Sequence, residues 1–441
     1  MTDQPLVHYA SRTDVGMRRA ANQDSLAVRL CSEHEEWSRC GHLFVVADGM
    51  GGHSVGDLAS RIAVESLPLA YFKMDAASLP ERMAGALTAG NRAINDKARE
   101  NPEFSDMGTT CTALSLSSEG AYVGHVGDSR AYRVRDGVIQ QLSFDHSLQW
   151  EMIRQGRATM DNVDMLHPRN VITRCLGPDQ NVTIDIEGPF DVRAGDQFVL
   201  CSDGLTGHVS DTEIGAIVSS MPPTEASRLL VNLANCRGGA DNITVVVAHV
   251  ERYPGITGSV VDRPETSEPP SAKEAPSKKS GHLLGNVSLM IFALLATVGL
   301  GLLAVGQNSY GLLLICPALI LGFVRLIFST GRVSDEKITS DTLATPETKR
   351  RDANMPALKA PYRSAQATVN DEFLEFLAEA QSELTQAAKE NGWTVDFDSL
   401  ADAQRQTVSA FNQNKRDRCV RLRAKAIDGL MKELYVKTRR S

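Results

Sequence analysis

The sequence predicts an α+β protein: a two-layer antiparallel β-sandwich flanked by helix pairs, followed by a transmembrane helical hairpin and a C-terminal helical segment. Three observations predict this order. Up to residue 252, short apolar runs alternate with turns and with amphipathic helical stretches. Two long apolar runs then lie between residues 282 and 329. Apolar residues at helical spacing return near the end of the chain.

The strands of the first region are short apolar runs bounded by turn residues. In chain order they are predicted at residues 25–30, 43–47, 110–116, 121–126, 131–134, 138–142, 171–175, 182–186, 197–201 and 243–250. Apolar residues at helical spacing predict helices over 79–100 and 224–235. Many strands joined by short turns, with helices inserted, are typical of antiparallel sheets covered by helices. We expect one domain over residues 1–252.

The chain changes character after residue 252. Residues 253–281 are rich in Pro, Ser, Lys and Glu, so they bury too little apolar surface to fold and indicate a disordered linker. The uncharged run 283–305 is long enough to cross a bilayer, and a second run, 311–328, contains Pro317 and Arg325. We expect two transmembrane helices within 282–329. The alternative for either run is a buried helical hairpin.

Charge predicts how such a pair of helices is oriented. Lys278 and Lys279 precede the first run, and Arg325, Arg332 and Lys337 lie at or beyond the end of the second. The connecting residues 307–310 carry no positive charge. The positive-inside rule therefore places the connection outside and both flanking regions in the cytoplasm. We expect a multi-pass protein of the inner (cytoplasmic) membrane.

The last part of the chain is predicted to be a second linker followed by helices. Residues 330–365 are polar and contain prolines, whereas 370–391 carry apolar residues on one helical face. Residues 400–441 are also helical in pattern and markedly basic. We expect 366–441 to form a cytoplasmic helical segment. Its basic residues are either a solvated face of a helical bundle or an electrostatic attachment to anionic lipid or an acidic partner.

Composition narrows the classes of function. The 441-residue chain has a formal net charge of −8, which argues against nucleic-acid binding as its overall role. Its eight cysteines are scattered without a Cys-x-x-Cys pair, so they indicate a reducing compartment and neither a disulfide framework nor a zinc site. The first residues contain no apolar signal-peptide core, and we expect no secretory signal.

Four aspartates lie at the ends of apolar strands: Asp48, Asp128, Asp203 and Asp241. Unpaired carboxylates are costly to bury within a strand, whereas strand ends on one rim of a sandwich can converge. Carboxylates without His or Cys partners indicate magnesium or manganese rather than zinc. The alternative is that the Asp-Gly pairs among them only form turns.

Further motifs accompany these aspartates along residues 6–252. The full set is Asp14-Val15-Gly16, Arg19, Asn22-Gln23-Asp24-Ser25, Val46-Ala47-Asp48-Gly49-Met50-Gly51-Gly52-His53, Gly108-Thr109-Thr110, Val126-Gly127-Asp128-Ser129-Arg130, Asp145-His146-Ser147, His167-Pro168-Arg169-Asn170, Thr173-Arg174, Leu176-Gly177, Ser202-Asp203-Gly204-Leu205 and Asp241-Asn242-Ile243-Thr244. In order and spacing it resembles the bacterial branch of the type 2C (PPM) metal-dependent protein Ser/Thr phosphatases. The resemblance implies their α/β/β/α phosphatase fold and says nothing of residues 253–441.

Carried over residue by residue, the resemblance implies a site for two or three divalent metal ions, manganese or magnesium. The implied ligands are Asp48 as a bridge between two ions, Gly49 through its carbonyl, Asp203 and Asp241 at the second ion, Asp128 at a third, and Asp24 through water. Arg19 is implied to bind the substrate phosphate, which its forked donors match. Asp48, Asp203, Asp241 and Arg19 are thus the expected catalytic residues. Two such ions, about 4 Å apart, generate a hydroxide nucleophile near neutral pH.

The sequence departs from the family pattern in two places. Gln23 replaces an acidic residue, and Met50 stands where animal members have a histidine proposed as general acid. His53 is one substitute for that acid; its alternative role is to hold the glycine turn. Residues 148–165 resemble the family's variable flap, a place for substrate selection.

The expected function is therefore a membrane-anchored protein serine/threonine phosphatase. Its expected partners are phosphorylated proteins and a bacterial Ser/Thr protein kinase system that it opposes, and no nucleic acid. Two other functions remain open at this point. One is a catalytically inactive phosphatase domain that serves as a binding module. The other is a membrane signalling scaffold whose C-terminal helical segment is the main functional part.

Overall fold

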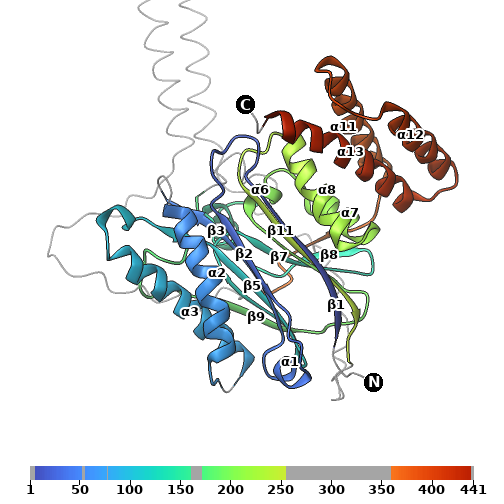
Figure 1. The fold of residues 1–441 in the computed structure, drawn as a ribbon. Helices are drawn as coiled ribbons and strands as arrows, with labels where there is room; N and C mark the ends of the chain where they lie inside the picture. Colours follow the sequence, from blue (N-terminus) through green and yellow to red (C-terminus); the bar gives the residue numbers. More distant parts are fainter. Residues whose placement is uncertain (1–4, 52–54, 77, 160–170, 255–358, 439–441) are drawn as a thin grey trace, which may run out of the picture. The chain divides into compact units, whose positions relative to one another are not determined.

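The structure, a computed structural model, describes residues 5–51, 55–76, 78–159, 171–254 and 359–438. Two antiparallel sheets form its centre (Figure 1). The first sheet has the strand order β1 (Leu6–Asp14), β11 (Ile243–Arg252), β10 (Gln197–Cys201), β7 (Arg130–Arg135), β8 (Val138–Gln141) and β12 (Arg363–Gln366). The second has the order β2 (Asp24–Arg29), β3 (His42–Met50), β5 (Cys111–Ser117), β6 (Gly120–Val126) and β9 (Asp185–Phe190), and β4 (Gly108–Thr109) pairs with β3.

Helix pairs cover the outer faces of the two sheets (Figure 1). Helices α2 (Val55–Lys73) and α3 (Leu79–Ala98) pack on the second sheet, and α7 (Asp211–Ser220) and α8 (Pro223–Cys236) pack on the first. Shorter helices, α1 (His34–Cys40), η1 (Pro102–Phe104), α4 (Leu148–Arg154) and α6 (Asp203–Thr206), lie in the connections. The predicted α+β sandwich flanked by helix pairs is therefore confirmed.

Strand β3 shows why the sequence folds into four layers. Its apolar run is continuous because both faces of the strand are covered. Phe44 and Val46 point into the core between the sheets, whereas Val45 and Ala47 pack under α2 and α3. Strand β11 repeats this alternation, with Val246 between the sheets and Val245 under α7 and α8. The sandwich is thus held by three apolar interfaces.

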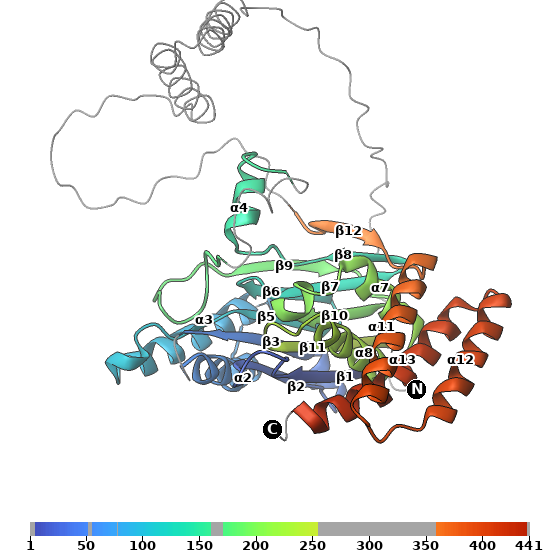
Figure 2. The ribbon, with the colours of Figure 1, turned by 90° about the horizontal axis from the view of Figure 1, so that it is seen from above.

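The C-terminal part of the chain belongs to the same compact unit as the sandwich. Strand β12 lies beside β8 in antiparallel register, at the edge of the first sheet (Figure 2). Helices α11 (Asp371–Glu390), α12 (Phe397–Asn412) and α13 (Arg416–Thr438) follow it. The buried side chains of Leu377 and Ile427 join the apolar cluster that contains Ile214 of α7 and Leu229 of α8. The C-terminal helices therefore extend the hydrophobic core of the sandwich.

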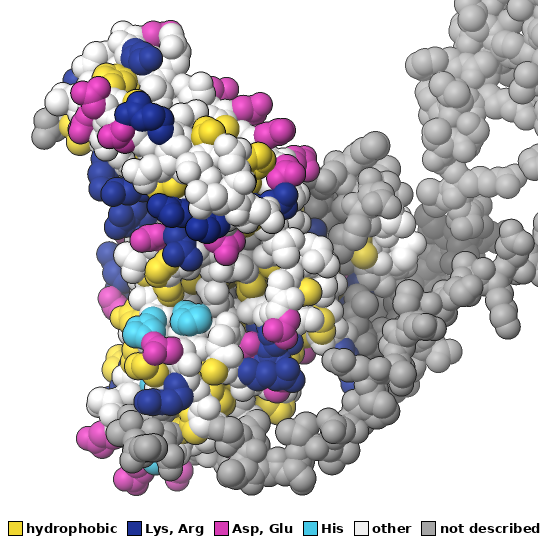
Figure 3. Space-filling view, turned by 90° about the vertical axis from the view of Figure 1, so that its right-hand side faces the viewer, with side chains coloured by type: hydrophobic (Ala, Val, Ile, Leu, Met, Phe, Trp, Pro, Cys, Tyr) yellow, Lys and Arg dark blue, Asp and Glu magenta, His cyan; other side chains and the backbone are white. Residues whose placement is uncertain are grey.

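Several basic residues of α13 are exposed to solvent. Arg418, Arg421, Lys425 and Lys432 are exposed, and Figure 3 shows Lys and Arg side chains gathered on the face that carries the C-terminal helices. The inner side, which includes Val420 and Ile427, is buried. This arrangement agrees with the interpretation of a solvated basic face on a helical bundle. Attachment to anionic lipid or to an acidic partner stays a prediction.

Several predicted elements differ from the structure. The helices predicted at 79–100 and 224–235 are present as α3 and α8, but β1 and α2 were not predicted. Strand β1 has few apolar residues and no clear alternation of apolar and polar ones. Helix α2 contains Pro68, which is atypical inside a helix. The strand predicted at 171–175 is wrong, because only Ile172 makes a bridge there, with Ser147. The strand predicted at 182–186 begins later, at Asp185.

The predicted membrane pair, 282–329, lies outside the described residues, as do residues 255–281 and 330–358 of the two predicted linkers. Within the part of the chain that the structure describes, no helix has the length and apolar character needed to span a bilayer. Residues 363–365, at the end of the second predicted linker, belong to β12.

Candidate metal centre

The predicted metal ligands lie together at one rim of the sandwich. Asp48 is near the end of β3 and pairs with Asp24, the first residue of β2. Asp128 follows β6, Asp203 follows β10, and Asp241 precedes β11. Because neighbouring antiparallel strands run in opposite directions, the end of one and the start of the next meet at the same edge. The fold therefore brings all five carboxylates into one cluster.

These carboxylates lie close enough together for their charges to affect one another's pKa values. Burial raises the pKa of Asp24 to about 7 and that of Asp128 to about 8. The pKa of Asp48 is raised well above its usual range, first by burial and then by the charges of Asp24, Asp203, Asp128 and Asp241. Burial and the charge of Asp241 also raise the pKa of Asp203. A cluster of this kind is stabilised by cations.

Unsatisfied oxygen atoms point to the same conclusion. Asp24, Asp128 and Asp203 each have a buried Oδ1 atom without a hydrogen-bond partner among the described residues. Buried polar atoms rarely stay unpaired, and hard divalent ions take carboxylate oxygens as ligands. The described side chains do not form a closed cage of three or more His, Cys, Asp or Glu ligands. The donor set nevertheless fits magnesium or manganese, because it is rich in oxygen and negatively charged.

Arg19 lies at the same rim and contacts one of the predicted ligands. Its Nη2 donates to Oδ2 of Asp241 at 2.7 Å, and both side chains are partly exposed. The structure thus places the predicted phosphate-binding arginine beside the carboxylates. Its contact with substrate stays a prediction, as do the individual ligand roles.

Glycines and one asparagine hold the loops of the site in place. Gly49 packs so closely on α2 that a Cβ atom would lie 2.0 Å from the carbonyl oxygen of Gly56. Gly16 has a φ of +80°, and a Cβ atom there would lie 2.2 Å from the carbonyl oxygen of Asp241. Asn242 donates to the carbonyl oxygens of Val15 and Ala21 at 2.9 and 3.0 Å. The loop that carries Arg19 is therefore fixed to the residue that follows Asp241.

Hydroxyl groups fix the carboxylates themselves. Ser202 Oγ donates to Oδ2 of Asp24 at 2.7 Å and accepts the backbone N–H of Thr244 at 2.9 Å. The backbone N–H of Asp48 donates to Thr110 Oγ1 at 3.0 Å, and the Thr110 hydroxyl also pairs with that of Ser129 at 2.8 Å. Asp48 and the turn that carries Asp128 are thus joined through one threonine.

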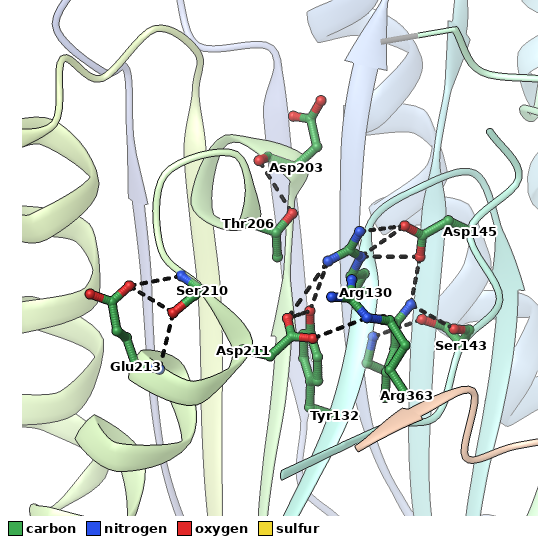
Figure 4. A network of polar contacts seen from close by, with 12 residues as sticks. Arg130, Tyr132, Ser143, Asp145, Asp203, Thr206, Ser210, Asp211, Glu213 and Arg363 are labelled. Atoms are coloured by element: carbon green, nitrogen blue, oxygen red, sulfur yellow. Dashed lines mark hydrogen bonds and ion pairs between the residues drawn. The ribbon is translucent and has the colours of Figure 1, made fainter. Parts of the chain in front are cut away.

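A network behind Asp128 was not predicted from the sequence. Arg130 lies between two carboxylates, and its Nη2 donates to Oδ2 of Asp145 at 2.6 Å (Figure 4). Its Nη1 lies 3.7 Å from Oδ1 of Asp211, at the start of α7. Asp145 is 3% exposed and also accepts from Gln141 Nε2 at 2.6 Å. Ser147, which follows His146, caps α4, because its side chain accepts from the N–H of Trp150.

Some predicted residues fall outside the described part of the chain. These are His53, His167, Arg169 and the last part of the predicted flap, residues 160–165. The described part of the flap contains α4. Ser202, Asn242 and Asp145 stand within the motifs found in the sequence, but their partners, among them Asp24, Ala21 and Arg130, come from other segments of the chain. Only the fold shows what these residues contact.

Comparison with known proteins identifies the family. Residues 17–229 match the family described as Protein phosphatase 2C. The chain is 34% identical over 249 residues to serine/threonine protein phosphatase PstP of Mycobacterium tuberculosis, a match over 56% of this chain and 46% of PstP. It is 35% identical over 253 residues to serine/threonine phosphatase stp of Listeria monocytogenes, which covers 56% of this chain and 96% of that protein. The chain therefore belongs to the protein phosphatase 2C family.

A solved structure agrees with this assignment. The S. agalactiae serine/threonine phosphatase superposes with a TM-score of 0.50 and 33% sequence identity, over 56% of this chain and 100% of that one. The chain spans about half the length of PstP, the longer of the two relatives. The resemblance found in the sequence is thus confirmed.

Proposed function

We propose that this chain is a metal-dependent protein serine/threonine phosphatase that hydrolyses phosphoserine and phosphothreonine on other proteins. The observation that carries the proposal is the cluster of five carboxylates, most of them with raised pKa values, beside Arg19 at one rim of the sandwich. Membership of the family and the names of the relatives support the same activity.

The roles of the residues follow from their positions. Asp48, Asp203 and Asp241, with the carbonyl of Gly49, would hold two ions; Asp128 would hold a third with Asp203, and Asp24 would orient water. When bound, manganese or magnesium supplies the Lewis acidity that makes water a nucleophile near neutral pH. Arg19 supplies paired donors for the phosphate oxygens. Its present partner, Asp241, is one of the groups that the ions would neutralise.

The test compares a site variant with a matched control. Asp48→Asn removes one negative charge from the cluster and keeps the size of the side chain. Asp136→Asn makes the same change in the exposed turn between β7 and β8, where asparagine tolerates the positive φ of 50°. With manganese, we expect the full chain and Asp136→Asn to release phosphate from a phosphothreonine peptide, and Asp48→Asn to release almost none. Equal rates for all three proteins would refute the proposed site.

We also propose that residues 282–329 anchor the phosphatase in the inner membrane as two helices, with both flanking regions in the cytoplasm. One structural observation supports an even number of crossings. Residues before 254 and after 359 form one compact unit, so both must lie on the same side of any membrane that the intervening chain crosses. Two helices satisfy this condition, and one would not.

Anchoring would keep the enzyme near membrane-bound phosphoproteins, and we propose that it opposes a Ser/Thr kinase of the same cell. The topology is tested by a reporter fused after Ser441. Activity of a reporter that works only in the cytoplasm is expected; a reporter active only in the periplasm would overturn the arrangement. The packing of the C-terminal helices on α7 and α8 favours a phosphatase over a scaffold whose C-terminal segment acts independently.

A further inference from the structure

The chain leaves the sandwich after β11 and returns at residue 359 to add one more strand to it. The returning strand, β12, follows Pro361 and pairs with β8, with Arg363 opposite Gln141. Tyr362 begins the pairing, because its backbone N–H donates to the carbonyl oxygen of Gln141 at 2.9 Å. Gln141 also contacts Asp145, one of the carboxylates around Arg130. The first residues of the returning segment therefore lie next to the network behind the metal centre.

Arg363 joins this network through Asp211. Its Nε lies 3.5 Å from Oδ2 of Asp211, whose other oxygen accepts from Tyr132 Oη at 2.9 Å and faces Arg130 (Figure 4). Asp211 thus lies between two guanidinium groups, one from the sandwich and one from the C-terminal segment. The side chain of Asp211 is 13% exposed and that of Arg363 is 39% exposed, so solvent screens this ion pair in part.

The network continues from Arg130 to the turn that carries Asp128. Arg130 donates to Asp145 through Nε and Nη2. His146, which follows Asp145, forms two hydrogen bonds with Gly127. The N–H of His146 donates to the Gly127 carbonyl at 2.7 Å, and the N–H of Gly127 donates to Nδ1 of His146 at 3.0 Å. Asp128 is the next residue in the chain after Gly127. A shift of Arg130 or Asp145 is therefore transmitted to a predicted metal ligand.

Tyr362 also contacts the start of the flap, the segment that begins with α4. Its ring packs against Phe144, with centroids 5.3 Å apart, and against Trp150 of α4, with centroids 6.5 Å apart. Its hydroxyl donates to Glu187 of β9. Trp150 is 6% exposed, so α4 is held at its base by these aromatic rings.

We propose that Tyr362 and Arg363 are positioning residues, through which the C-terminal segment sets the flap helix α4 and the Asp128 turn of the phosphatase site. The inference rests on the proposed function and concerns residues that lie beyond the region matching the family, 17–229. The active site is then completed by a segment that follows the predicted membrane pair. Any event that lifts β12 from β8 would loosen the metal site and the flap together.

The test uses full-length variants and two binding readouts. Arg363→Ala removes the charge that pairs with Asp211, and Arg363→Lys restores a charge there. Arg405→Ala is the control: it removes an exposed arginine of α12 that pairs with nearby Asp402. Manganese affinity is measured by calorimetry. We expect the weakest manganese site to lose roughly two- to fivefold in affinity in Arg363→Ala, as for the loss of one partly screened ion pair. Arg363→Lys should recover most of it, and Arg405→Ala should match the parent.

Tyr362 is tested by the KM for a phosphothreonine peptide. Tyr362→Ala removes the ring from Phe144 and Trp150 and should raise KM about fivefold, whereas Tyr362→Phe keeps the ring and should stay near the parent. Unchanged manganese affinity and unchanged KM, with only a lowered Tm, would show a purely structural role and overturn the inference. If the parent binds manganese but hydrolyses nothing, the proposed function fails, and the manganese affinities of the Arg363 variants still decide the inference.

Discussion

Replacing Leu377 with alanine is expected to destabilise the phosphatase sandwich, although Leu377 lies far along the chain from it. The side chain is fully buried and belongs to the cluster shared by α11, α13, α7 and α8. Leucine-to-alanine changes at such sites cost about 2–5 kcal/mol, because the lost contacts and the remaining cavity add. The same change at an exposed site, Val408→Ala on α12, should stay within about 0.5 kcal/mol.

The assay is hydrogen exchange of the full chain at increasing urea, followed by mass spectrometry. Peptides from α8 and from α13 should lose protection at the same urea concentration, and both should do so at lower urea in Leu377→Ala. Cooperative unfolding of this kind is expected where one core spans both segments. If α13 opens first and α8 keeps its parental protection in Leu377→Ala, the two segments do not share a core and the reasoning is refuted.

Two further predictions concern the site and the core. Arg19→Ala should raise the KM for a phosphopeptide without weakening manganese binding, because Arg19 offers donors to phosphate and competes for Asp241; calorimetry that shows lost manganese affinity with an unchanged KM would contradict this role. The contribution of the buried histidines His42 and His125 to stability should fall as pH drops below about 6.5. Burial lowers the pKa of His42 to about 4 and that of His125 to about 3, so below that pH the unfolded chain binds protons that the folded protein excludes. The raised pKa values of Asp24 and Asp128 act in the opposite direction, so urea midpoints at pH 7.5 and 5 are compared between the parent and His125→Gln. Relative to His125→Gln, the parent should lose stability at pH 5; an equal change in both proteins would show the histidine contribution to be wrong.

The sequence predicts the sandwich well where burial leaves a clear pattern. Strand β3 is apolar on both faces because it lies between two layers, and its end is marked by Asp48. The convergence of Asp48, Asp128, Asp203 and Asp241 was also predictable, since each stands at a strand end. The hydrogen-bond and ion-pair partners around these residues could not be predicted. Asp145 binds Arg130 across a hairpin, and nothing in the local pattern distinguishes that contact from a turn.

Strand β12 shows more clearly what cannot be predicted from the sequence. Its four residues, Arg363–Gln366, have no apolar alternation, and their strand geometry comes from pairing with the edge of β8. Propensity cannot identify a strand that depends on a partner more than 200 residues earlier in the chain. The helices that follow were predicted because their own apolar faces are periodic. What the sequence did not show is that these faces pack on α7 and α8.

The most direct test of the metal-dependent site is a manganese titration of the full chain after removal of metals by a chelator. Phosphate release from a phosphothreonine peptide is measured for the parent and for Asp203→Ala, with the unfolding of both proteins as a control. The parent should be inactive without metal and reach a saturating rate as manganese is added, whereas Asp203→Ala should stay inactive although it is folded. Hydrolysis by the parent that persists in the chelator, or a parental rate in Asp203→Ala, would contradict the account.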